Sequence, residues 1–400
     1  MKKLFLIIFL ILSLSSCKLI KFKRLMKNGD LIASSDKITI PFEKRMGLIV
    51  IQVEINGKKY DFIVDTGATN VISPDMAKEL QLKKKGKVSV TDSQSNKQTA
   101  YFFEIPELFI QNFSFQNTTC IALDIYDEKL NFNCLGVDGI IGANLMKEGI
   151  WQIDYQKKEI TIYKNNTLVD LNGYDSINFK SNIQFHPTLT IDIHGATSKL
   201  KVDTGSNGCL RLSNRYKNII FEKDSLELVN SQYGSITSGI FGKGKNETKE
   251  FYQADSVLLG NYLCQDFIIG FQDEGSHLLG NQFFANFNLI IDWQKSMLYI
   301  NKVDQIVLHS DKRFPVSIDR KEDLKTYYIR SIYTKHQEQN DMIAVGDTVI
   351  SINNVLTSDF TQDNYCEFIQ ALENSEQLNF EFIHNNDTLS HTIFSEEQYQ

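Results

Sequence analysis

The sequence lacks three features that mark common functional classes. It has no excess of positive charge: 42 Lys and Arg stand against 49 Asp and Glu, so the formal net charge is −7 and nucleic acid is not expected as a partner. Its N-terminal apolar run, Leu4 to Leu12, is short for a membrane-spanning helix. The 6 cysteines do not have the spacing of a zinc site, and the histidines do not cluster with them, so we expect no metal and no cofactor.

The N-terminus has the pattern of an export signal. Met1-Lys2-Lys3 supplies a charged start, an apolar run follows, and Leu14-Ser15-Ser16-Cys17 supplies small residues before a cleavage point. This last segment resembles the bacterial lipoprotein box, which implies a signal at residues 1–16 and a lipidated Cys17. The resemblance places the protein outside the cytoplasm, anchored to a bacterial membrane at the periplasmic face or the cell surface. A plain secretory signal and an uncleaved anchor are the alternatives.

A basic tether follows at residues 17–37. It carries Lys18, Lys21, Lys23, Arg24 and Lys27. These charges favour contact with anionic lipid headgroups, and a solvated linker explains them equally well.

Two copies of one motif organise the rest of the chain. Asp65-Thr66-Gly67-Ala68 recurs as Asp203-Thr204-Gly205-Ser206, and in both copies a turn glycine precedes the aspartate by eight residues (65 − 57 and 203 − 195). Ile140-Ile141-Gly142 recurs as Leu278-Leu279-Gly280 at the same offset, 138 (203 − 65 and 280 − 142). Such a repeat predicts two similar lobes.

This paired pattern resembles the aspartic proteases of the pepsin and retropepsin type over residues 38 to 302. The resemblance implies a mainly β, bilobal fold of two duplicated β-barrel lobes, at residues 38–165 and 166–303. It implies catalytic roles for Asp65 and Asp203. The other implied site residues support the loops: Thr66, Gly67, Ala68, Thr204, Gly205 and Ser206 within them, and Gly142 and Gly280 beneath them.

Two paired carboxyl groups suit the hydrolysis of an amide. The reaction needs a base for the proton of a water molecule and an acid for the carbonyl oxygen. Two carboxyls a few ångströms apart cannot both ionise easily, so they share one proton and supply both functions. A lone Asp-Thr-Gly is more simply a strand-to-turn corner, but that interpretation does not explain two equivalent copies.

Local patterns predict several elements of the lobes. Asn56-Gly57 predicts a hairpin, and Ser73-Pro74 predicts the start of a short helix. The alternating stretch from Val88 to Phe103 lies where the family carries its flap, and a glycine-rich stretch from Tyr233 to Gly242 is its counterpart in the second lobe. Tyr101 and Tyr233 are the candidates for a flap tyrosine.

The cysteines leave several pairings open. Cys120 could bond to Cys134, and Cys209 to Cys264, in an exported protein. Buried free thiols are the alternative, and the sequence slightly favours them.

The last part of the chain, residues 304–400, has none of the lobe repeat. Its segment Val345-Gly346-Asp347-Thr348-Val349-Ile350-Ser351-Ile352-Asn353-Asn354 resembles a bacterial PDZ domain, which implies a small α+β domain. A helix at about 364–372 and a hairpin around Asn385-Asn386-Asp387 suit that fold. The usual carboxylate-binding loop is not recognisable near Leu324 to Ile329.

We therefore expect a lipid-anchored aspartic endopeptidase with a PDZ-like domain for substrates or partners. Its partners would be peptides or proteins and, through Cys17, a lipid bilayer, and one chain would supply a monomeric protease unit. A catalytically inactive peptide-binding lipoprotein of the same fold is the alternative. A third hypothesis is a protease that acts on one partner protein only.

Overall fold

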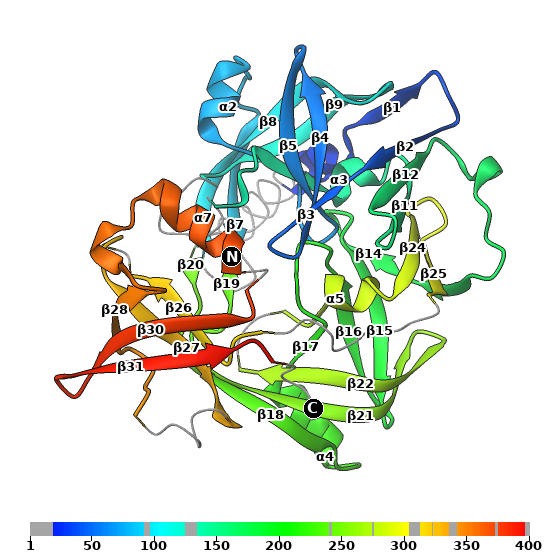
Figure 1. The fold of residues 1–400 in the computed structure, drawn as a ribbon. Coiled ribbons are helices and arrows are strands. Elements are labelled where there is room, and N and C mark those ends of the chain that lie inside the picture. The colour runs from blue at the N-terminus through cyan, green and yellow to red at the C-terminus, as the bar shows by residue number, and fades with distance from the viewer. Residues whose placement is uncertain are drawn as a thin grey trace, which may run out of the picture.

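The computed structural model describes residues 19–91, 97–124, 134–239, 242–273, 276–303, 313–321, 323–335, 342–372 and 375–396, and it is mainly β (Figure 1). Within these residues the strands form a nine-stranded, a six-stranded and a 14-stranded sheet, with a two-stranded ribbon beside them. The barrels that result are consistent with the β fold of aspartic proteases.

The nine-stranded sheet belongs to the first lobe of the repeat. Its strands are β1 (Asp30–Ala33), β3 (Glu43–Arg45), β4 (Leu48–Ile55), β5 (Lys58–Asp65), β6 (Val71–Ile72), β7 (Gly86–Thr91), β8 (Lys97–Ile110), β9 (Phe113–Ala122) and β10 (Gly139–Gly142). The predicted turn joins β4 to β5, with Asn56 and Gly57 both at positive φ. Helix α2 (Pro74–Glu79) begins as predicted, because Ser73 Oγ accepts a hydrogen bond from the Met76 amide at 3.0 Å.

The second lobe supplies most of the 14-stranded sheet. Its strands are β14 (Lys180–Ser181), β15 (Pro187–Ile193), β16 (Ala196–Val202), β17 (Leu210–Ser213), β18 (Glu227–Gly234), β21 (Glu247–Leu259), β22 (Tyr262–Gln272) and β23 (Leu278–Leu279). Strands β19 (Ser238–Gly239) and β20 (Gly242–Lys243) form the separate ribbon. Helix α4 (Asn214–Phe221) follows β17 as α2 follows β6.

The two lobes repeat the same strand arrangement around the motif. In the first, β10 runs parallel to β5 and antiparallel to β6. In the second, β23 runs parallel to β16 and antiparallel to β17. The duplicated sequence therefore folds into a duplicated structure at the point where each motif lies.

The six-stranded sheet joins the lobes. It contains β2 (Lys37–Pro41), β11 (Ile150–Asp154) and β12 (Glu159–Tyr163) from the first lobe, and β13 (Asp175–Asn178), β24 (Phe287–Asp292) and β25 (Met297–Lys302) from the second. Strands β11 and β24 are antiparallel, and Gln152 lies opposite Ile290. These two residues are repeat equivalents (290 − 152 = 138), so an approximate two-fold axis passes through this pair. A single hydrophobic core runs through both lobes around this sheet.

The C-terminal region continues the sheet of the second lobe. It contains β26 (Val316–Arg320), β27 (Tyr327–Tyr333), β28 (Thr348–Ile352), β29 (Val355–Leu356), α7 (Gln362–Leu372), β30 (Gln377–His384) and β31 (Asp387–Phe394). The helix and the hairpin predicted there are both present. Strand β27 pairs with β18, so this region, drawn in orange and red in Figure 1, is joined to the second lobe by backbone hydrogen bonds.

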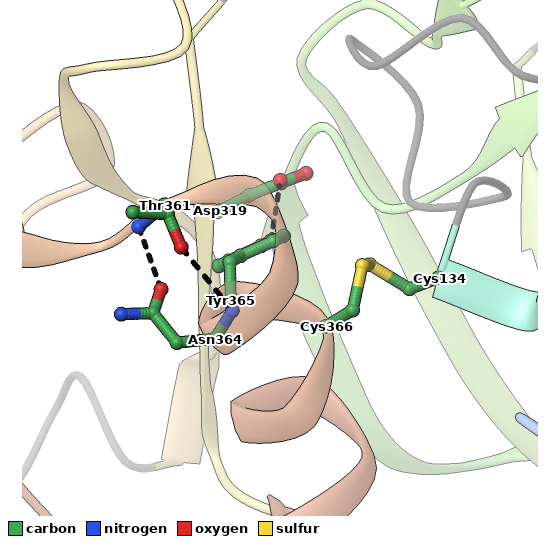
Figure 2. The surroundings of a disulfide bond; sticks show 6 residues. All are labelled: Cys134, Asp319, Thr361, Asn364, Tyr365 and Cys366. Carbon is green, nitrogen blue, oxygen red and sulfur yellow. Dashed lines mark hydrogen bonds between the residues drawn. A yellow bond between two sulfur atoms is a disulfide. The ribbon is translucent and has the colours of Figure 1, made fainter.

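A disulfide fastens the same region to the first lobe. Cys134 is bonded to Cys366 on α7, across a sequence separation of 232 (Figure 2). The Cys120–Cys134 pairing was therefore wrong: Cys120 is buried in the core shared by the lobes, whereas Cys134 packs into the core of the C-terminal region. Cys209 and Cys264 do not form the possible second pair either. Cys120, Cys209 and Cys264 are free thiols, as the alternative slightly favoured from the sequence has it.

The expected signal and Cys17 lie outside the described residues. Residues 19–27 of the tether form a helix. In the part of the chain that the structure describes, no helix is long and apolar enough to cross a membrane.

Candidate active site

Each lobe places one aspartate at the end of an equivalent strand. Strand β5 ends at Asp65, and Gly142 of the parallel strand β10 lies opposite it. Asp203 follows β16 directly, and its amide donates a hydrogen bond to the Leu279 carbonyl of β23 at 2.9 Å. The neighbouring parallel strand thus fixes the backbone of each acid.

The two threonines cross-link the loops. Thr66 N–H donates to Thr204 Oγ1 at 3.0 Å, and Thr204 N–H donates to Thr66 Oγ1 at 3.1 Å. Each hydroxyl in turn donates to a carbonyl of the other lobe, Thr66 to Val202 at 2.9 Å and Thr204 to Val64 at 2.8 Å. Both threonines are fully buried, so these four bonds form where water cannot compete for the donors and acceptors.

The glycines let the two carboxyl groups meet. A β-carbon at Gly67 would lie 2.5 Å from Cγ of Asp203, and one at Gly205 would lie 2.2 Å from Cγ of Asp65. Each carboxyl group therefore packs against the backbone of the opposite loop, and any side chain at either position would displace it. Asp65 Oδ1 also accepts a hydrogen bond from the Gly67 amide at 2.7 Å.

The fourth position of each motif is held by the helix that follows the later glycine. Ala143 N–H of α3 (Ala143–Met146) donates to the Ala68 carbonyl at 2.9 Å. Asn281 N–H of α5 (Asn281–Phe284) donates to the Ser206 carbonyl at 2.8 Å.

Gly142 and Gly280 lie directly beneath these loops. A β-carbon at Gly142 would lie 2.5 Å from the Ala68 carbonyl oxygen, and one at Gly280 would lie 2.5 Å from that of Gly208. The absence of a side chain lets the supporting strand touch the loop in both lobes.

Three buried asparagines that the sequence analysis missed complete the support. Asn144 Oδ1 accepts from the Asn70 amide at 2.8 Å, and Asn70 Oδ1 accepts from the Gly142 amide at 2.7 Å. Asn281 Nδ2 donates to the Thr204 carbonyl at 2.6 Å. The repeat gave no signal for them, because Asn144 corresponds to Gln282 (144 + 138).

The two aspartates have different electrostatic surroundings. Burial, with the nearby charge of Asp203, raises the pKa of Asp65 to about 7. Burial acts on Asp203 in the same direction, but the ammonium group of Lys201, together with the smaller effect of the Arg211 charge, outweighs it and lowers the pKa of that carboxyl. Lys201 Nζ lies 2.9 Å from Asp203 Oδ2. The shared proton is thereby biased towards Asp65.

Lys201 was also missed, although the sequence carried a signal for it. It lies on β16 two residues before Asp203, which follows the strand directly, so alternation places both side chains on one face. The equivalent position in the first lobe is Ile63 (201 − 138), which is apolar. His186 lies nearby, and burial together with the charge of Lys201 lowers its pKa to about 4.

The dyad lies in a cavity of about 850 Å³ between the lobes. Its first-lobe wall is mostly apolar and includes Leu48, Val71, Val88, Val90 and Ile140. Its second-lobe wall is mostly polar. The expected flap strand β7 lines the cavity, as does the second-lobe segment at 236–239, whereas Tyr101 and Tyr233 are not among its lining residues.

We expect the Lys201→Met variant to raise the pKa values of the dyad. Removing the ammonium group ends its stabilisation of the Asp203 carboxylate, so protonation of that group should move up by about one pH unit or more. The measurement is a carbon NMR titration of the aspartate carboxyls, with Asp65→Asn and Asp203→Asn used for assignment. Lys201→Arg keeps the charge and should titrate like the parent. An unchanged titration in Lys201→Met would contradict the assigned role.

Residues 51–145 match the family model described as aspartyl protease. The match includes Asp65 and Gly142 and ends before the second copy of the motif. No curated protein matches the chain. The first lobe is thus similar to an aspartyl protease, which suggests a hydrolase of the aspartic peptidase type.

Proposed function

We propose that the protein is an aspartic endopeptidase that activates a water molecule between Asp65 and Asp203. The observation that carries the proposal is the contact of each carboxyl group with the glycine of the opposite loop. Two equivalent acids meet in a cavity between the lobes, and one of them is held ionised by a lysine. The aspartyl protease match of the first lobe supports the same reaction.

The raised pKa of Asp65 and the lowered pKa of Asp203 indicate which carboxyl group gives a proton and which takes one in the first step. The Asp203 carboxylate takes a proton from water, and the resulting hydroxide attacks the peptide carbonyl carbon. The protonated Asp65 gives its proton to the carbonyl oxygen, which yields a neutral gem-diol. When the C–N bond breaks, Asp203 returns a proton to the leaving amine and Asp65 recovers one from a diol hydroxyl. Lys201 keeps its charge throughout.

Lys201 also supports the alternative, an inactive peptide-binding protein. An ammonium group 2.9 Å from Asp203 would weaken that carboxylate as a base if it stayed in place when substrate bound. The two hypotheses differ in whether the Asp65–Asp203 dyad hydrolyses the bound peptide.

We expect Asp65→Asn and Asp203→Asn each to lower peptide hydrolysis by at least ~10³-fold, and the double variant to be no slower than either. Either change removes half of one acid–base unit, so the losses do not add. The measurement is the rate on a mixed peptide pool, with Asp61→Asn as a control that changes a carboxyl group on the same strand away from the dyad. A double variant much slower than both single variants would refute the shared unit.

We further propose that the protein is exported and held at a bacterial membrane by a lipidated Cys17. The support is the charged, apolar and small-residue pattern of residues 1–17, followed by the basic helix at 19–27.

Cys17→Ser should therefore leave the signal uncleaved or release the protein from membranes, because the thiol is the lipid acceptor. Fractionation and mass spectrometry of the mature N-terminus check this. An unmodified mature chain that begins at another residue would show that the anchor is wrong.

One chain supplies the whole cleft in this proposal, as a monomeric unit. The reciprocal threonine bonds connect residues 138 apart in the same chain (204 − 66), so the meeting of the lobes is intramolecular and independent of protein concentration.

The C-terminal region is proposed to be a PDZ-like domain that forms one wall of the cleft. Asp319, which is 1% exposed, forms ion pairs with Lys243 at 2.9 Å and Arg330 at 3.1 Å. Arg330 also donates to the Thr237 carbonyl at 2.9 Å and to Ser238 Oγ at 2.7 Å. These bonds fasten residues 237–238 of the glycine-rich segment to the C-terminal region.

Strand addition to this domain requires a rearrangement. One edge of β27 is paired with β26, and the other is paired with β28 and β18. A substrate or partner segment can therefore join β27 only if it displaces a strand. The candidate for displacement is β26, because among the described strands it pairs with β27 only.

Peptide binding to this domain should then increase amide hydrogen exchange in β26 and leave β30 protected. Exchange followed by mass spectrometry, with and without a pool of peptides that have free C-termini, measures this. Binding without any change in β26 would contradict the displacement.

A further inference from the structure

The second-lobe side of the cleft gathers six basic side chains. They are Lys201, Arg211, Lys243, Lys249, Arg313 and Arg330. Lys201 is paired with Asp203, and both Lys243 and Arg330 are paired with Asp319. Arg313 also interacts with another group. Arg211 and Lys249 have no ion pair within the described residues, so their two charges remain to be explained.

Arg211 is buried and only partly satisfied. It lies on β17, it is 8% exposed, and its Nε donates to the Ser276 carbonyl at 3.1 Å. Its Nη2 is buried and has no hydrogen-bond partner in the described structure. A guanidinium nitrogen in this state loses its water without replacement, which is unfavourable unless a ligand supplies an acceptor.

Lys249 reaches the same place from another strand. Its side chain crosses Gly270 of β22, where a β-carbon would lie 2.5 Å from Lys249 Cε. Gly270 is the register partner of Arg211 on the adjacent strand. Because Gly270 has no side chain, the Lys249 side chain can pass over this position and place its ammonium group beside the Arg211 guanidinium.

The charges of Asp203 and then Glu247 act on Arg211, but neither carboxylate forms an ion pair with Arg211 or Lys249 within the described residues. Glu247 accepts hydrogen bonds from the Asp273 amide at 3.0 Å and from Gln272 Nε2 at 3.3 Å. Burial, followed by the charges of Arg211 and Arg313, lowers the pKa of Lys249 to about 7. The site therefore carries unfavourable positive potential that an anion would relieve.

We propose that Arg211 and Lys249 form a subsite for a carboxylate of the substrate, supplied by an acidic side chain on the second-lobe side of the scissile bond. A carboxylate accepts from a planar guanidinium and an ammonium group at once. The apolar first-lobe wall suits an apolar residue on the other side of the bond. This specificity rests on the proposed peptidase function, with the dyad between the two walls.

The test compares two pools of C-terminally amidated peptides that differ at one position only. This position is Glu or Asp in the acidic pool and Gln or Asn in the amide pool. We expect the full-length protein to cleave the acidic pool faster. Arg211→Gln and Lys249→Gln should each lower kcat/KM for the acidic pool by roughly 10- to 100-fold, as loss of a hydrogen bond to a charged group does. The loss for the amide pool should be clearly smaller, and for Arg211→Gln it reflects the charge that Arg211 exerts on Asp203. Lys243→Gln makes the same charge change at a cation already paired with Asp319, and should keep the preference for the acidic pool.

Fluorescence anisotropy of the labelled pools with the Asp65→Asn variant measures the subsite without turnover. The subsite is supported if the acidic pool binds more tightly and this advantage is lost when Arg211→Gln or Lys249→Gln is added. This holds even if no hydrolysis is found, and in that case only the peptidase proposal fails. Equal binding of both pools, or equal losses for both in the variants, would overturn it. The same pools with free C-termini serve as a comparison. If the acidic pool bound more tightly only in this form, the site would bind the terminal carboxylate, and the proposal would also be overturned.

Discussion

The reciprocal hydrogen bonds between Thr66 and Thr204 are the constraint on which the rest of the site depends. These bonds are buried and join two loops that are 138 residues apart. Each threonine hydroxyl also donates a hydrogen bond to a carbonyl of the opposite lobe. With the loops fixed in this way, each glycine faces the opposite carboxyl group. The six-stranded sheet and the shared core then keep the lobes in register around the same approximate two-fold axis.

Charge breaks this symmetry. The backbone of the two loops is nearly equivalent, but Lys201 stands beside Asp203 where the first lobe has Ile63. The same difference extends along the cleft, whose first-lobe wall is apolar and whose second-lobe wall is basic. A symmetric scaffold therefore holds an asymmetric acid–base pair and two unlike walls, which suits a reaction in which one carboxyl group gives a proton while the other takes one.

The sequence predicted the features that depend on local pattern or on the repeat. The hairpin at Asn56-Gly57, the cap at Ser73 and the equivalence of the two lobes follow from turn chemistry, capping and a constant offset. The meeting of Asp65 and Asp203 was inferred from the equivalence of the two motifs and from their resemblance to aspartic proteases. Strand alternation places Lys201 on the same face as Asp203, but the repeat gives no signal for it, because the equivalent residue of the first lobe is Ile63.

Other features depend on contacts between distant segments, which no local pattern encodes. Cys134 pairs with Cys366 because the C-terminal region packs against both lobes, a placement that the sequence does not show. The position of Lys249 beside Arg211 likewise needs the pairing of three strands and the empty space at Gly270. The PDZ-like pattern predicted the helix and the hairpin of that region, but not that both edges of β27 would be paired.

The central claim is that one chain builds one acid–base unit from two acids, and a mixing experiment tests it most directly. The inactive Asp65→Asn and Asp203→Asn variants are combined at equal concentration and assayed on a peptide pool, with the parent protein as the positive control. If the cleft forms within one chain, no mixed cleft with both acids can arise, and the mixture should stay as inactive as its components across a wide range of concentration. Recovery of activity in the mixture, rising with concentration, would mean that the carboxyl groups meet between chains, and would contradict the account.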